Sequence, residues 1–145
     1  EYGLIEPIVD FAGQNRPVWG TCAGAIFLSK LRGFNQPVLR LIDIEIKRNA
    51  FGRQVDSFEA EVMTTLPRTS GTWSSSGGGD TGGFPGVFIR APRVVEAGPS
   101  VDVLGRLSTG EIVAARQKNL LVTVFHPELT DDHRFHEYFL GMMPD

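Results

Sequence analysis

The chain has 145 residues, 41% of them hydrophobic and 21% charged, which is typical of one soluble domain large enough to bury a core. Its formal net charge of −3 excludes a basic nucleic-acid-binding surface, and its single cysteine, Cys22, excludes a disulfide framework and a cysteine-rich zinc site. Because no apolar run is long enough to span a membrane, we expect a cytoplasmic protein that contacts neither membrane nor nucleic acid.

In the first half of the chain, hydrophobic periodicity separates helices from strands. Apolar residues recur at helical spacing near the start, where Pro7 is tolerated in a first turn. Further on, isoleucines alternate with charged residues, the period-two pattern of a half-buried strand. The expected elements are, in order, an amphipathic helix carrying Ile5, Ile8, Val9 and Ala12, a buried strand ending at Val18 and Trp19, a helix over about 24–31, and strands over 42–47 and 58–63.

The second half begins with a change of composition. Residues 67–83 are rich in Gly and Ser and cannot pack a core, so we expect an inserted surface loop. Within it, Gly77, Gly79 and Gly82 have the spacing of a dinucleotide-binding fingerprint, but no strand precedes them and no helix follows, which favours the loop. The strands expected after it cover 86–89, 101–104, 111–115 and 120–125, with turns at 109–110 and 118–119.

The last expected element is a helix capped by Thr130, with Asp131 and Asp132 near its start. Its buried face is expected to carry Phe135, Phe139 and Met142 or Met143.

The order of these elements indicates the fold class. No repeat divides the chain, so residues 1–145 are interpreted as one α/β domain. A buried strand that feeds a helix, followed by several alternating strands, favours a mixed sheet with helices packed on it. Chemistry is then expected at the carboxyl ends of the strands, where open α/β sheets carry their sites.

Gly20-Thr21-Cys22-Ala23-Gly24 has the form of a nucleophile elbow between a strand and a helix. The glycines permit a sharp turn that exposes the thiol of Cys22. The amino end of the following helix is expected to lower the pKa of that thiol and to bind an oxyanion. Because free cysteine is commonly buried, an inert structural cysteine is the alternative, and this segment alone leaves both interpretations open.

His126-Pro127-Glu128 supplies a base and a group to orient it. Proline favours an extended tripeptide, in which residues two apart project to the same side, so we expect His126 and Glu128 to be neighbours. A carboxylate on one imidazole nitrogen fixes the tautomer and leaves the other nitrogen for a thiol. Taken alone, the tripeptide is also compatible with a surface turn. Beside an elbow cysteine, it favours a Cys-His-Glu triad.

Two further groups of residues carry weaker signals. His133 and His136 have a spacing compatible with metal ligation, but the exposed face of a last helix explains them as well. Arg48, Arg53 and Arg90 are able to bind a carboxylate or to cover the surface, and the sequence leaves both roles open.

Four segments, 17–24, 48–59, 86–92 and 125–134, carry a resemblance that spans nearly the whole chain. Together they resemble the class I glutamine amidotransferases, specifically the glutaminase subunits of pyridoxal 5′-phosphate synthase. Segment 48–59 separates this branch from glutaminases of other pathways. The resemblance implies that Cys22 attacks the side-chain amide of L-glutamine, that His126 moves the proton and that Glu128 holds His126. Ammonia then leaves, and water releases glutamate from a glutamyl thioester.

The resemblance also implies ligands and a partner. The backbone N–H of Ala23 is expected to bind the oxyanion, and Arg48, Ile89 and Arg90 match residues that contact the glutamine, Ile89 through its backbone. No cofactor and no metal are expected in this subunit. The ammonia is expected to pass to a (β/α)₈-barrel synthase subunit, which uses it for pyridoxal 5′-phosphate synthesis.

For the fold, the resemblance implies a three-layer, flavodoxin-like mixed sheet with helices on both faces. Family members begin with a strand-helix-strand unit whose Gly-Gly-Glu-Ser segment completes the oxyanion hole, and this chain lacks it. The chain also opens on Glu1 without an initiator Met or a leader-like pattern, so we expect it to be incomplete at its amino end. The alternatives are a non-catalytic interaction subunit of the same complex and a cysteine hydrolase of the related protease and chaperone group.

Overall fold

The computed structural model describes residues 3–33, 36–48, 57–66 and 83–143. Its helices are α1 (Ile5–Gly13), α2 (Ala23–Leu28), the short 3₁₀ turn η1 (Pro127–Leu129) and α3 (Arg134–Gly141). Its strands are β1 (Val18–Thr21), β2 (Lys30–Arg32), β3 (Ile44–Lys47), β4 (Ser57–Thr64), β5 (Phe84–Ile89), β6 (Arg93–Ala97), β7 (Asp102–Arg106), β8 (Ile112–Gln117) and β9 (Leu120–Thr123).

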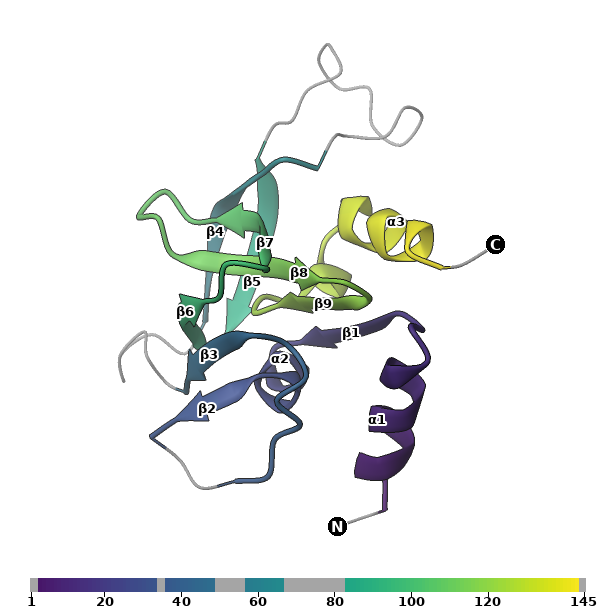
Figure 1. The fold of residues 1–145 in the computed structure, drawn as a ribbon. Coiled ribbons are helices and arrows are strands. Elements are labelled where there is room, and N and C mark those ends of the chain that lie inside the picture. Colours follow the sequence, from purple (N-terminus) through teal and green to yellow (C-terminus); the bar gives the residue numbers. More distant parts are fainter. Residues whose placement is uncertain (1–2, 34–35, 49–56, 67–82, 144–145) are drawn as a thin grey trace.

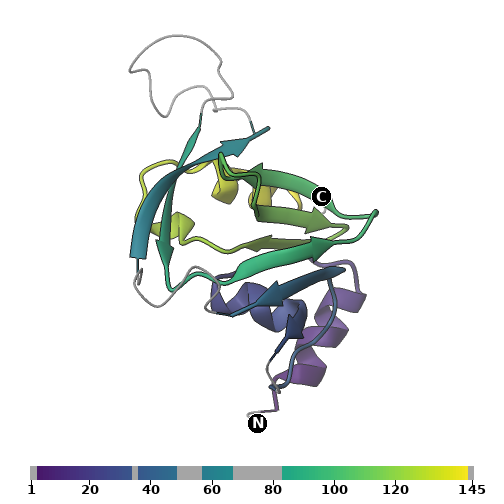
Figure 2. The same ribbon diagram turned by 90° about the vertical axis from the view of Figure 1, so that its left-hand side faces the viewer.

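These strands form two sheets. The larger has the order β1-β9-β8-β7-β4-β5, in which β1 and β9 run parallel and the remaining neighbours run antiparallel. The smaller has the order β2-β3-β6, with β2 and β3 parallel. In Figure 2, β4 and β5 run steeply across the ends of the other strands, so the larger sheet is strongly curled. The expectation of a mixed sheet is confirmed.

Helices cover both faces of the sheet at β1. The ring of Trp19 packs against His136 and Phe139 of α3, at centroid distances of 5.0 and 5.4 Å. The next residue, Gly20, lies against the first turn of α2 at Gly24. Since successive residues of a strand face opposite ways, α2 and α3 lie on opposite faces, as Figure 1 shows. The three-layer arrangement predicted from the resemblance is therefore present at this edge.

An aromatic cluster joins β5 to the end of β9 and to α3. Phe84, Phe88, Phe125 and Phe135 are all fully buried. Their ring centroids lie 5.0 to 5.6 Å apart in four pairs, three of them edge-on. Such pairs add attraction beyond the area that they bury. The cluster therefore holds β5 in place against the segment that follows β9.

The predicted strands are confirmed, whereas one helix is shorter than expected and two strands were missed. The helix expected over 24–31 ends at Leu28, because Ser29 is extended and Leu31 lies in β2 beside β3. Strand β2 has three residues and β6 buries only Val94, so neither has a clear alternation. The isoleucines at 42, 44 and 46 are buried, and the turns at Gly110 and Lys118 have the positive φ angles that tight turns favour.

The two terminal helices also differ from the expectation. Of the apolar residues expected on one face of α1, only Ala12 is buried, because α1 lies outside β1, at the edge of the described sheet (Figure 1). Thr130 does not cap α3, which begins at Arg134. The Thr130 hydroxyl instead accepts a hydrogen bond from the Asp132 N–H, and the Asp132 carboxylate accepts one from the Arg134 N–H.

The predicted buried face of α3 is present, with Phe135 fully buried and Phe139 and Met142 half-buried, while Met143 is 43% exposed. The loop expected over 67–83, including its glycine fingerprint, lies outside the described residues except for Gly83. No helix among the described residues is long and apolar enough to cross a membrane.

Candidate active site

Cys22 lies at a sharp turn between β1 and α2. Its φ of 51° and ψ of −106° are rare for a residue with a side chain, which is the strained geometry predicted for an elbow. Its backbone N–H donates to the carbonyl oxygen of Thr123, at 2.8 Å, so the pairing of β1 with β9 holds the turn. The turn geometry predicted for an elbow is present, and the side chain of Cys22 is only partly buried.

Gly20 is the residue that makes the turn possible. A Cβ atom placed on it would lie 2.5 Å from the carbonyl oxygen of Gly24 and 2.9 Å from the backbone nitrogen of Ala25. Both are backbone atoms, which cannot rotate away. The absence of a side chain at Gly20 therefore lets the first turn of α2 approach β1 and places Cys22 between them.

His126 and Glu128 form a close pair. Nδ1 of His126 lies 2.8 Å from Oε2 of Glu128. Because an ionised carboxylate only accepts hydrogen bonds, Nδ1 carries the proton and Nε2 is left for another group. The tripeptide is not extended as predicted, since Pro127 begins η1. A 3₁₀ turn brings residues two apart together as well, so the predicted pair forms in a different conformation.

The parallel pairing of β1 and β9 brings the thiol and the imidazole to one edge. Thr21 is in register with Thr123, and both strands end there in the same direction. Cys22 follows directly, and His126 follows three residues after β9. The end of β5 contacts both residues. The Cys22 thiol donates to the Ile89 carbonyl oxygen at 3.7 Å, and the backbone N–H of His126 donates to the Val87 carbonyl oxygen at 2.8 Å.

The thiol of Cys22 is mainly protonated at neutral pH. Burial raises the pKa of Cys22 above its ordinary value, and the negative charge of Glu128 raises it further, while a hydrogen bond from the Ala23 N–H lowers it. The net shift is upward, so the expectation of a lowered pKa is wrong. The reason is that the loss of solvation on burial outweighs the hydrogen bond from the Ala23 N–H at the start of α2.

We expect the alkylation of Cys22 by iodoacetamide to have a higher pH midpoint in the folded protein than in the urea-unfolded chain. Cys22 is the only cysteine in the sequence, so the intact mass reports on this thiol alone. Glu128→Gln removes the nearby negative charge and should lower the midpoint of the folded protein. A folded midpoint below the unfolded one would contradict the assignment.

Glu128 stays ionised. Burial raises the pKa of its carboxyl group, but hydrogen bonds from His126 and from its own backbone N–H, together with the charges of His126 and His136, hold the pKa below its usual value. The carboxylate is therefore negative over the whole neutral range. Its contact with Nδ1 fixes the orientation of the His126 ring.

The comparisons with known proteins agree with this geometry. The model of the SNO glutamine amidotransferase family matches residues 1–145. The chain belongs to this family. Among its relatives, the pyridoxal 5′-phosphate synthase subunit PdxT of Geobacillus kaustophilus is 52% identical over 145 residues, which are 99% of this chain and 67% of the relative. The PdxT subunit of Dehalococcoides mccartyi is 50% identical over 147 residues, which are 99% of this chain and 69% of the relative.

Solved structures place the fold in the same group. A crystal structure of a glutamine amidotransferase superposes with a TM-score of 0.81 at 39% identity, covering 97% of this chain and 68% of the other. A putative GMP synthase subunit from Thermoplasma acidophilum superposes with a TM-score of 0.59 at 12% identity, covering 95% and 63%, and shows the shared fold alone. The resemblance found in the motifs is therefore confirmed for this SNO family member, and so is its glutamine amidotransferase-like fold.

The residues predicted to bind glutamine or its oxyanion lie on three segments of this SNO family member. Ile89 ends β5 with its carbonyl oxygen at the thiol, and Arg90 follows it with a positive φ of 46°. Ala23 opens α2, where its N–H reaches the sulfur of Cys22. Arg48 follows β3, and its Nη1 donates to Oε1 of Gln36 at 2.6 Å. Arg53 lies outside the described residues.

His133 and His136 do not form a metal site with a third His, Cys, Asp or Glu side chain among the described residues. Their rings lie 6.1 Å apart, and His136 packs edge-on against Trp19. Among the described residues, no group of three or more His, Cys, Asp or Glu side chains is arranged to hold a metal ion. In this SNO family member, His136 is better described as a packing residue close enough to Glu128 to affect its charge.

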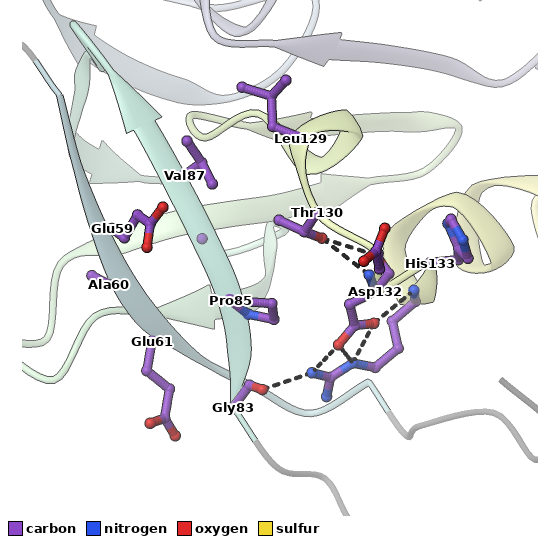
Figure 3. A pocket seen from close by; sticks show the side chains of 13 residues that line it. Glu59, Ala60, Glu61, Gly83, Pro85, Val87, Leu129, Thr130, Asp132 and His133 are labelled. Carbon is purple, nitrogen blue, oxygen red and sulfur yellow. Dashed lines mark hydrogen bonds and ion pairs between the residues drawn. The ribbon is translucent and has the colours of Figure 1, made fainter. Parts of the chain in front are cut away.

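A cavity of about 800 Å³ lies beside the site, between the β4–β5 pair and the turn that leads from η1 to α3 (Figure 3). Val87 of β5 and Leu129 of η1 line it, and Glu59 and Glu61 line the wall formed by β4. Its lining includes neither Cys22 nor His126, so the cavity is separate from the elbow. Motif analysis named Ile89 as a backbone contact but missed the Val87 carbonyl oxygen, since backbone groups leave no signal in side-chain identity.

Proposed function

We propose that this SNO family member is a glutaminase that hydrolyses L-glutamine to L-glutamate and ammonia through Cys22, His126 and Glu128. The observation that carries the proposal is the shared edge: a strained elbow cysteine and a carboxylate-oriented histidine follow two paired parallel strands. The raised pKa of Cys22 makes a base necessary, because little thiolate exists at neutral pH without one. His126, whose Nε2 is free of Glu128, is that base.

The reaction proceeds in two halves. His126 removes the thiol proton as the sulfur of Cys22 attacks the side-chain amide carbon, and a carbon–sulfur bond forms. The tetrahedral intermediate collapses, the carbon–nitrogen bond breaks, and the imidazolium of His126 gives its proton to the departing ammonia. Water then attacks the glutamyl thioester with His126 again as base. The carbon–sulfur bond breaks, the thiol regains its proton, and glutamate leaves.

Backbone and cationic groups around the elbow complete the proposal. The Ala23 N–H already reaches the sulfur and is the proposed donor to the developing oxyanion. Arg90 stands where β5 ends at the thiol, a suitable place for the α-carboxylate of glutamine, and the Ile89 carbonyl oxygen accepts from the substrate or from the thiol. Arg48 is retained as a third contact, on the strength of the family motif alone.

The relatives are named as subunits of pyridoxal 5′-phosphate synthase, and this supports the proposed destination of the ammonia. We infer that a (β/α)₈-barrel synthase subunit receives it and uses it to build pyridoxal 5′-phosphate. A cytoplasmic location is part of the proposal, because a single catalytic thiol must stay reduced.

A glutamine analogue with an electrophilic diazoketone in place of the amide tests the proposal. Incubated with the full natural chain and its synthase partner, the analogue should add one covalent group to Cys22, and L-glutamine should slow the labelling. L-asparagine is the matched control, since it is one methylene shorter. Absence of labelling, together with absence of glutamate release, would instead indicate a non-catalytic subunit.

We expect Glu128→Gln to lower kcat for glutamine hydrolysis about 10- to 100-fold, with a smaller change in KM. The amide keeps the shape but loses the charge that stabilises the imidazolium of His126. The effect should be weaker than for a buried carboxylate, because the side chain of Glu128 is 52% exposed and solvent screens it. Steady-state glutamate release measures both constants, and an unchanged kcat would remove Glu128 from the triad.

A further inference from the structure

Arg134, the first residue of α3, is only 3% exposed, and its guanidinium group binds Asp132, Gly83 and Leu66 among the described residues. Nε lies 3.1 and 3.0 Å from the two carboxylate oxygens of Asp132, and Nη2 lies 2.7 Å from Oδ2. Nη2 also donates to the Gly83 carbonyl oxygen at 2.8 Å, and Nη1 donates to the Leu66 carbonyl oxygen at 3.4 Å. The bonds to Asp132 and Gly83 are drawn in Figure 3.

These contacts require the shape of a guanidinium group. Nε and Nη2 bind the Asp132 carboxylate, Nη2 also binds the Gly83 carbonyl oxygen, and Nη1 binds the Leu66 carbonyl oxygen. A lysine carries its charge on one atom and cannot reach all three partners at once. Burial makes the pairing of Arg134 with Asp132 necessary, because either charge left alone in that position is strongly destabilising.

The bonds of Arg134 reach the active site through β5. Gly83 directly precedes β5, and the guanidinium group also lies over the ring of Phe84, 5.6 Å from its centroid. Four and six residues beyond Gly83, the Val87 and Ile89 carbonyl oxygens hold the His126 N–H and the Cys22 thiol. A shift of β5 along its axis or away from α3 therefore moves both acceptors together.

We propose that the Asp132–Arg134 pair is a positioning clamp, which holds the start of β5 to α3 and thereby sets where the Val87 and Ile89 carbonyl oxygens meet His126 and Cys22. The predicted effect of the clamp on turnover rests on the proposed glutaminase function. It touches neither the substrate nor the reacting atoms. The proposed effect of Asp132 and Arg134 on the site passes through β5.

Arg116 offers a matched control. It also ties α3 to a neighbouring strand, since Nη1 donates to the Tyr138 hydroxyl at 2.9 Å and Nε donates to the Lys118 carbonyl oxygen at 2.7 Å. Its guanidinium group lies over the Tyr138 ring, 5.5 Å from the centroid. Arg116 belongs to β8, and the contacts described for it do not involve β5. Loss of this contact should weaken the packing of α3 without moving the carbonyl oxygens at the thiol.

The experiment compares Arg134→Lys and Arg116→Lys in the full natural chain with its synthase partner, at a temperature where both variants are folded. We expect Arg134→Lys to lower kcat/KM for glutamine about 10- to 100-fold and Arg116→Lys to change it less than about twofold. The pH midpoint of Cys22 alkylation should fall in Arg134→Lys, because the thiol loses the acceptor at Ile89, and should not move in Arg116→Lys.

Equal activity and equal alkylation midpoints in the two variants would overturn the clamp, as would losses that scale only with the melting temperature. If Arg134→Lys does not fold, Asp132→Asn decides in its place, since it keeps the arginine and the shape of its partner. The alkylation readout needs no turnover. A wild type without glutaminase activity would therefore contradict the proposed function, whereas an unmoved midpoint in the variants would contradict the clamp.

Discussion

Cys22→Ser should abolish glutamine hydrolysis, with a loss of at least about 10⁴-fold in kcat, because a serine hydroxyl paired with this histidine is a far weaker nucleophile than the thiol. The change removes little volume at a partly buried position, so the melting temperature should stay within about 2 °C. Glutamate release by the full natural chain with its synthase partner measures the effect.

Two controls make the Cys22→Ser result specific. After iodoacetamide treatment, peptide mapping should find the label at position 22 in the wild type and not at that position in the variant, since Cys22 is the only cysteine of these 145 residues. Binding of the synthase partner should be unchanged, because the substitution alters one atom at the elbow. A variant that hydrolyses glutamine at the wild-type rate would refute the proposed mechanism.

Gly20→Ala should be the most destabilising single methyl addition at the elbow. The new Cβ atom would stand 2.5 Å from the Gly24 carbonyl oxygen, and the first turn of α2 would have to move away from β1. Overpacking against backbone costs about 3 kcal/mol of unfolding free energy, which for a chain of this size is a fall of about 10 °C in melting temperature. Activity should fall with it, because Cys22 shifts.

Gly24→Ala is the matched control, on the same turn and with the same added methyl group. A Cβ atom placed on Gly24 meets no heavy atom within 4 Å, counting the described residues outside its own helix turn. Alanine also favours a helix over glycine, so the melting temperature should stay the same or rise. Equal destabilisation by the two substitutions, measured by thermal unfolding, would show that the approach of α2 to Gly20 is not what limits the fold.

Several features of the fold could be read from local patterns. The alternation of isoleucines with charged residues correctly located β3, because one face of that strand is buried against the core. Strand β6 escaped prediction because only Val94 is buried in it, and β2 escaped because a three-residue strand shows no period. Their existence depends on pairing with β3, a contact between distant segments.

Local signals failed where the environment, and not the motif, sets the outcome. The pKa of Cys22 was expected to fall beside a helix amino end, yet burial and the charge of Glu128 raise it. Thr130 has the residue type of a helix cap, yet its hydroxyl binds Asp132 in the turn ahead of α3. In each case the folded conformation, through burial at Cys22 and through the turn at Thr130, outweighs the local preference.

By itself, the sequence was enough to propose which residues carry the chemistry, because the glycines around Cys22 and the pairing of His126 with Glu128 are local features of short segments. Only the tertiary structure decided how these segments meet. The parallel register of β1 with β9 puts them at one edge, and β5 supplies the carbonyl oxygens between them. Arg134 joins residues distant in the chain, and such contacts depend on packing that no single segment encodes.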